Sequence, residues 1–181
     1  NIEIVSSICE KFPSIPFQIG GGIRNLETAE KYLRAGANYI IIGTKAVEDP
    51  NFIKILCEKF PGKIIVGIDA KNGEVATEGW KSISNKNAVE LAKEFENYGV
   101  VEIIYTDIEK DGMMKGLNVE ATLNLAKNIN IPVIASGGVS CIDDIQKMKS
   151  YSESGVSGII VGRALYERKF SIKEANEIFT K

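Results

Sequence analysis

Short apolar runs rich in valine and isoleucine recur along the chain, and polar residues hardly interrupt them. Unbroken apolar runs of this length are typical of parallel strands that are covered on both faces. The pattern therefore predicts six strands, at residues 17–21, 39–44, 63–69, 102–108, 132–138 and 157–162.

Between these strands, apolar residues recur at the three- and four-residue spacing of helices. We expect helices at residues 26–35, 51–60, 87–98, 119–128 and 142–151, and another at residues 2–12. Asn25, Asp49, Asn87 and Asn118 are of the residue types that cap helix starts. Strands and helices that alternate in this way form either an open, doubly wound sheet or a closed eight-stranded barrel.

An internal repeat favours the barrel. The segments Gly-Gly-Ile at 21–23 and Ile-Ile-Gly-Thr at 41–44 recur, at nearly the same spacing, as Gly-Gly-Val at 137–139 and Ile-Val-Gly-Arg at 160–163. Two such copies, separated by two more strands, match strands three to eight of a (β/α)8 TIM barrel. Because such a barrel typically needs about 250 residues, we expect residues 1–181 to form a single, N-terminally incomplete barrel domain that lacks its first two βα units.

The composition favours a compact α/β domain with a small-molecule partner. The 181 residues are 44% hydrophobic and carry a net charge of −2, so no basic face is available for nucleic acid or for an anionic membrane. Three widely spaced cysteines, no leader and no membrane-length apolar run indicate a cytoplasmic protein. Histidine is absent, which removes the commonest general base and metal ligand.

Glycines end the strands of both repeat copies. In β/α barrels the active site lies at the carboxyl ends of the strands, and backbone N–H groups there commonly bind phosphate. Two phosphate sites are therefore expected, one at Gly137, Gly138, Gly162 and Arg163, and one at Gly21, Gly22, Arg24, Gly43 and Thr44. Such a pair predicts a substrate with a phosphate at each end, whereas the simpler alternative is that these glycines only allow tight turns.

Acidic residues follow two of the predicted strands. Asp69 ends a wholly apolar strand at the catalytic rim, where a carboxylate can deliver a proton; the alternative is a helix cap or a loop ion pair. We expect Thr106 to point inward beside Asp69, and Asp111 to reach back to the substrate from its loop. Alternation along the strand sends Asp107 toward the helices, and Glu109 and Lys110 are expected to form a solvated pair.

The segment between Asp69 and the next predicted helix is too long for an ordinary βα turn. Asn72 and Gly73 form a hairpin signal, so we expect a small β-flap over residues 71–81. Trp80 is the only tryptophan of the chain, and it can either stack on a heteroaromatic substrate or anchor the flap on the barrel.

Taken together, these segments resemble the ProFAR isomerase family of histidine biosynthesis, the phosphoribosylformimino-5-aminoimidazole carboxamide ribotide isomerases. The resemblance rests on the segments 17–24, 67–69, 79–80, 105–112, 136–138 and 160–165, and covers essentially the whole chain. It implies an Amadori rearrangement of an aminoaldose to an aminoketose, without a cofactor or a metal. It also implies Asp69 as the general acid, Thr106 as its supporting hydroxyl and Asp111 as a substrate ligand.

The family's general base is an aspartate that ends the first barrel strand, and that strand is not in this sequence. We therefore expect a fragment that does not turn over substrate alone, and a monomer when the protein is full-length. Alternatives are the cyclase subunit of imidazole glycerol phosphate synthase, a broader isomerase that also accepts the equivalent tryptophan-pathway substrate, and a non-catalytic phosphate-binding barrel module. The segments at 79–80 and 106–108 resemble the isomerase more than the cyclase.

Overall fold

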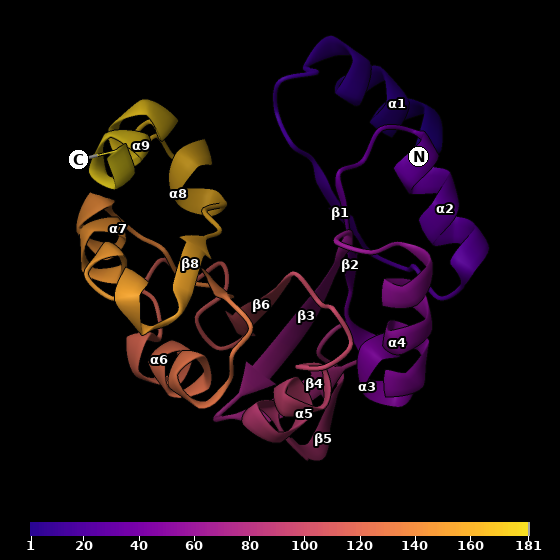
Figure 1. The fold of residues 1–181 in the computed structure, drawn as a ribbon. Coiled ribbons are helices and arrows are strands. Elements are labelled where there is room, and N and C mark those ends of the chain that lie inside the picture. The colour runs from indigo at the N-terminus through magenta and orange to yellow at the C-terminus, as the bar shows by residue number, and fades with distance from the viewer. Residues whose placement is uncertain (181) are drawn as a thin grey trace.

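The computed structural model describes residues 1–180, which form a curled sheet with helices along its outer side (Figure 1). Six parallel strands follow one another in the order β1-β2-β3-β6-β7-β8. Their bounds are β1 Gln18–Gly20, β2 Tyr39–Ile42, β3 Ile64–Lys71, β6 Glu102–Asp107, β7 Val133–Ser136 and β8 Val156–Ile159. This sequential parallel order is the order that right-handed βα units produce in a barrel.

A β-hairpin extends from the end of β3. Its strands are β4 (Glu74–Thr77) and β5 (Ser82–Asn87), and β4 pairs antiparallel with β3. The expected flap is therefore confirmed, but it continues to Asn87 instead of ending at residue 81. The sheet has eight strands, two more than the six expected. The second strand was missed because its residues are almost all polar and exposed, which leaves no apolar pattern to detect.

The helices alternate with the parallel strands, as expected. They are α1 Ile2–Lys11, α2 Leu26–Arg34, α3 Thr44–Glu48, α4 Pro50–Lys59, α5 Ala88–Glu94, α6 Val119–Asn128, α7 Ile142–Lys149, α8 Arg163–Tyr166 and α9 Ile172–Thr180, with the 3₁₀ turn η1 at Ser152–Ser154. Of these, α3, α8, α9 and η1 were not among the expected helices. Short helices such as α3 follow a strand too closely to show a periodic pattern of their own.

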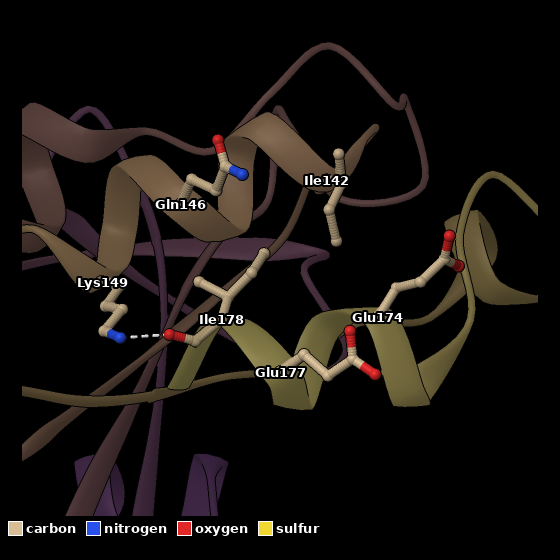
Figure 2. A pocket seen from close by; sticks show the side chains of 6 residues that line it. All are labelled: Ile142, Gln146, Lys149, Glu174, Glu177 and Ile178. Carbon is tan, nitrogen blue, oxygen red and sulfur yellow. Dashed lines mark hydrogen bonds between the residues drawn. The ribbon is translucent and has the colours of Figure 1, made fainter. Parts of the chain in front are cut away.

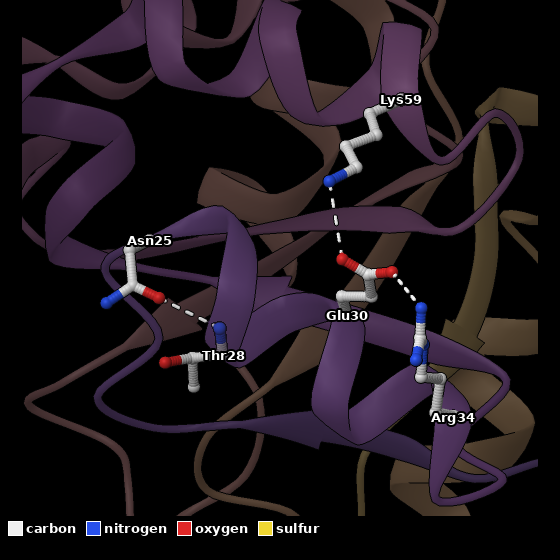
Figure 3. Close-up of polar contacts among 5 residues, drawn as sticks. All are labelled: Asn25, Thr28, Glu30, Arg34 and Lys59. Atoms are coloured by element: carbon white, nitrogen blue, oxygen red, sulfur yellow. Dashed lines mark hydrogen bonds and ion pairs between the residues drawn. The ribbon is translucent and has the colours of Figure 1, made fainter.

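Asparagine and aspartate side chains start four of these helices. Asn25 accepts a hydrogen bond from the Thr28 N–H at 2.8 Å, at the start of α2 (Figure 3). Asp49, Asn87 and Asn118 cap α4, α5 and α6 in the same way. All four expected caps are confirmed, and each satisfies an N–H group that the first helical turn leaves unpaired.

Several predicted boundaries differ from those in the structure. The strands stop before the glycine pairs, because Gly21, Gly22, Gly137 and Gly138 have positive φ angles that a strand does not allow. The helix expected over residues 87–98 covers only Ala88–Glu94, since Asn87 is its cap and the backbone turns from Phe95 onward. The helix expected over 51–60 begins one residue earlier, at Pro50, a favourable first position for proline.

Apolar residues form a layer on each face of the sheet. Ile64, Val66 and Ile68 of β3 belong to the main core, which lies between the strands and the helices. Ile65, Ile104 and Ile134 form a separate inner cluster, contributed by β3, β6 and β7. Because side chains alternate along a strand, this inner cluster identifies the face that points into the barrel.

The curled sheet is open. Strand β1 pairs only with β2 and β8 pairs only with β7, and a gap separates the two edge strands (Figure 1). The outer edge of β1 is therefore unpaired among the described residues. None of the described helices is long and apolar enough to cross a lipid bilayer.

The three cysteines lie in different surroundings, and their accessibility gives a test of the fold. Cys57 on α4 is buried, which raises its pKa to about 11, whereas Cys141 is exposed. At pH 8 only about one part in a thousand of the Cys57 thiol would be ionised. We expect a thiol reagent to label Cys141 rapidly and Cys57 only after unfolding in urea, as mass spectrometry of the labelled peptides can measure. Rapid labelling of Cys57 in the folded protein would contradict this packing.

Candidate functional site

Three polar residues form a row at the carboxyl ends of neighbouring strands. Asp69 of β3 is paired in register with Thr106 of β6, and Thr106 is paired with Ser136 of β7. Each of them lies an even number of residues beyond an isoleucine of the inner cluster, so all three share the inward face. The expectation that Thr106 points inward beside Asp69 is confirmed.

The flap closes over one end of this row. The Trp80 indole Nε1–H donates a hydrogen bond to Asp69 Oδ2 at 2.8 Å. Nearby, the Glu78 N–H donates to the Thr44 hydroxyl at 3.2 Å. Trp80 thus anchors the flap on the barrel, which is one of its two expected roles, while its contact with a substrate stays a prediction.

The residue after Thr106 faces the helices. Asp107 is buried, and its carboxylate accepts hydrogen bonds from Asn118 Nδ2 at 2.5 Å and from the Glu109 N–H at 2.9 Å. The expected outward direction of Asp107 is confirmed, and its role is to hold both ends of the loop at residues 108–117. The expected pairing of Glu109 with Lys110 was wrong, because Glu109 forms an ion pair with Lys71 at 3.1 Å.

This loop carries Asp111 to the glycine pair that follows β7. A hollow of about 260 Å³ opens there, and five of its lining residues are ones that the sequence predicted: Asp111, Gly137, Gly138, Gly162 and Arg163. A Cβ atom on Gly138 would lie 2.5 Å from the Gly116 carbonyl oxygen, and one on Gly137 would lie 2.7 Å from that of Asp107. Glycine is therefore required at 137 by the close approach of the end of β6 and at 138 by that of the loop, whatever else these residues bind.

The repeat in the sequence is also a repeat in the backbone. Gly43 and Gly162 precede the short helices α3 and α8 with nearly equal dihedral angles, φ −100° and ψ −108° against φ −108° and ψ −97°. Gly21 and Gly22 have positive φ angles, as Gly137 and Gly138 do. Any Cβ on Gly21, Gly22 or Gly162 would meet no atom within 4 Å, so open space faces these glycines.

The two copies lie on different parts of the sheet, with the row of Asp69 and Thr106 between them. Gly21 and Gly22 follow β1 and Gly43 follows β2, whereas the second copy follows β7 and β8. Arg24 is exposed after the first glycine pair. The Thr44 and Arg163 side chains contact neighbouring loops: Thr44 contacts the flap, and Arg163 Nη1 donates to the Gly112 carbonyl at 2.8 Å.

Two further residues belong to the rim, and a third, Tyr105, faces outward beside it. Ser136 was noted only as part of a glycine motif, although its register with Thr106 places it in the row. Tyr166 lines the hollow and is 88% exposed; it lies one helical turn after Gly162, a spacing that could have identified it. Burial first, and then the Asp107 carboxylate, raise the pKa of Tyr105 to about 12, so this outward-facing phenol stays protonated.

A different cavity lies away from the strand ends. It measures about 460 Å³ and is formed between α7 and α9 by Ile142, Gln146, Lys149, Glu174, Glu177 and Ile178 (Figure 2). Lys149 donates a hydrogen bond to the Ile178 carbonyl and so joins the two helices. Within residues 1–180, no group of acidic side chains or cysteines has a metal-binding arrangement.

Two glycine substitutions separate packing from ligand binding. Gly138→Ala should lower the free energy of unfolding by more than about 1 kcal/mol, because its φ is +95° and its Cβ would collide with Gly116. Gly162→Ala should change it by less than about 0.5 kcal/mol, yet weaken binding of inorganic phosphate about tenfold by narrowing the hollow. Urea unfolding and calorimetric titration measure both effects. If Gly162→Ala keeps its phosphate affinity, the glycine serves only the turn.

Comparison with known proteins agrees with this geometry. The family described as "Histidine biosynthesis protein" matches residues 1–171. A relative from Hahella chejuensis is 56% identical over 175 residues, which are 97% of this chain and 72% of the relative. Relatives from Marinobacter nauticus and Stutzerimonas stutzeri are each 55% identical, and the alignments cover 97% and 98% of this chain and 71% and 72% of the relatives.

All three relatives are named 1-(5-phosphoribosyl)-5-((5-phosphoribosylamino)methylideneamino) imidazole-4-carboxamide isomerase. These names agree with the resemblance to ProFAR isomerases and do not favour the cyclase. The match over residues 1–171 and the identities above 50% establish the relationship, and the chain belongs to the family of histidine biosynthesis proteins.

Proposed function

We propose that this chain contributes the general acid of an isomerase. Its substrate is the molecule that the name of its relatives describes, which carries a phosphoribosyl group at each end. The observation that carries the proposal is the register of Asp69 with Thr106, in a row between two glycine-ended strand pairs. A carboxylate in that position can meet the centre of a molecule whose two phosphates are held at the two sides of the barrel mouth.

The reaction needs an acid at the ring oxygen of the aminoaldose. In the proposed mechanism Asp69 protonates that oxygen as the ring opens, and the Thr106 hydroxyl beside it orients the carboxyl group. A base then takes the proton from C2 of the open-chain iminium, and the enolamine so formed gains a proton at C1 as it becomes the aminoketose. Asp111, at the edge of the hollow, holds the substrate while these proton transfers occur.

The two phosphates would be bound mainly by backbone N–H groups. The candidate residues on one side are Gly21, Gly22, Gly43 and Thr44, with Arg24 as a charged donor, and on the other Gly137, Gly138, Gly162 and Arg163. The matching backbone angles of Gly43 and Gly162 support two equivalent sites. The proposed partner is thus a small molecule with two phosphates, and a monomeric state and a cytoplasmic location stay predictions.

We also propose that six parallel strands correspond to strands three to eight of the barrel, and that two further βα units complete it. The unpaired edges of β1 and β8 support this, as does coverage of 72% of the Hahella chejuensis relative. By the family resemblance, the general base belongs to the first of those strands. The described residues would then bind substrate while the base comes from the completing units.

Completion of the barrel tests this division. Residues of the Hahella chejuensis relative that lie outside the aligned 72% can be joined ahead of Asn1 to supply the two units. We expect the fused protein to isomerise the substrate, and the 181-residue chain alone to bind inorganic phosphate without turnover. Turnover by the chain alone, measured by chromatographic separation of the aminoaldose from the aminoketose, would show that the base lies within it.

In the fused protein, Asp69→Asn should lower kcat by about 10²-fold or more and leave KM little changed, because it removes a proton donor but keeps the size of the side chain. Asp143→Asn is the matched control, since Asp143 is exposed in the first turn of α7 and away from the row. A normal kcat for Asp69→Asn would remove Asp69 from the mechanism.

A further inference from the structure

The Arg163 side chain is held between two partners. Its Nε donates to Glu167 Oε1 at 2.6 Å, four residues later along α8, and its Nη1 donates to the Gly112 carbonyl at 2.8 Å. Gly112 lies 51 residues earlier in the chain and follows Asp111 directly. Both donors therefore have partners, and the planar guanidinium spans the distance between α8 and the loop at residues 108–117.

That loop is also attached at both of its ends by backbone hydrogen bonds. At its start, the N–H groups of Lys110 and Asp111 donate to the Asp107 carbonyl at 3.1 and 3.0 Å. At its end, the Gly116 N–H donates to the Gly138 carbonyl at 2.9 Å. Between these points, Met113 and Lys115 are exposed, Met114 packs against the apolar cluster that contains Val139 and Ala164, and the Arg163 side chain bonds to the Gly112 carbonyl.

Thr44 occupies the position in the first repeat copy that Arg163 occupies in the second, and its side chain makes a similar contact. Each follows the glycine before a short helix, and each bonds to the backbone of a loop at the mouth: Thr44 to the Glu78 N–H and Arg163 to the Gly112 carbonyl. Their backbone N–H groups remain candidates for phosphate binding, because the loop contacts use only the side chains.

We infer that Arg163 is a positioning residue, whose guanidinium holds the Asp111 loop over the hollow beside Gly138 and Gly162. The assignment of Asp111 to substrate binding rests on the proposed function, whereas the contact between Arg163 and the loop does not. Glu167 fixes the direction of the guanidinium by accepting from Nε, so that Nη1 points at the loop. A charged donor on a carbonyl is a stronger restraint than a neutral hydrogen bond.

Trypsin provides a direct measurement, because Lys115 lies in the loop and is exposed. Cleavage of a folded protein at such a site requires the loop to open locally. Arg163→Gln should accelerate cleavage after Lys115 about tenfold in the 181-residue chain, while the urea midpoint stays unchanged. Arg163→Lys, which keeps the charge but not the fork, should give an intermediate rate.

Arg34→Gln is the matched control. Arg34 forms the same kind of ion pair as Arg163 does within its helix, with Glu30 four residues earlier at 2.7 Å, and Figure 3 shows it on α2 with Lys59 as the other partner of Glu30. Its replacement should leave cleavage after Lys115 unchanged. Cleavage of Arg163→Gln at the wild-type rate would overturn the inference.

Titration with inorganic phosphate separates this inference from the proposed function. If Arg163 acts on the loop, Arg163→Gln should lose less than about threefold in phosphate affinity while the loop opens faster, because the backbone donors remain. A loss above tenfold with unchanged cleavage would instead identify the guanidinium as a phosphate ligand and overturn the inference. Failure of every variant to bind phosphate would count against the proposed function and leave the loop result intact.

Discussion

The parallel register between β3 and β6 is the constraint on which the rest of the site depends. Backbone pairing places Asp69 opposite Thr106 and Thr106 opposite Ser136. A shift by one residue would turn Asp69 toward the helices and bring Ala70 to the mouth, because side chains alternate along a strand. The inner cluster of Ile65, Ile104 and Ile134 stabilises this register, because the same shift would also break the apolar contacts among these three side chains.

The glycines act on the same edge of the sheet. Beyond Ser136, two residues with positive φ angles turn the chain sharply, and the absence of a Cβ on Gly138 lets Gly116 approach. The loop that carries Asp111 can therefore lie directly on the strand end. A glycine pair at such a point serves two purposes at once, since the turn that exposes backbone N–H groups also makes room for the neighbouring loop.

Much of this arrangement could be predicted from the sequence, because its signals are local. Apolar runs located the parallel strands, asparagine and aspartate caps located the helix starts, and the repeat gave the order of the strands. Alternation along β6 correctly separated Thr106 from Asp107. The second flap strand was not predictable in this way, because residues 82–87 are held by pairing with β4 and not by burial.

The directions of long side chains at the mouth could not be predicted from the sequence. These directions determine which polar groups of the site are already hydrogen-bonded before a substrate binds. No sequence pattern connects Trp80 with Asp69, yet the Trp80 indole N–H donates a hydrogen bond to one oxygen of the Asp69 carboxylate. The flap residues Glu78, Gly79 and Trp80 all have positive φ angles, which cost free energy in the two residues that are not glycine. The contacts with Asp69 and Thr44 offset that cost. A substrate that takes the place of these contacts would therefore also release the strained flap, so binding at the row and movement of the flap are linked through the same two side chains.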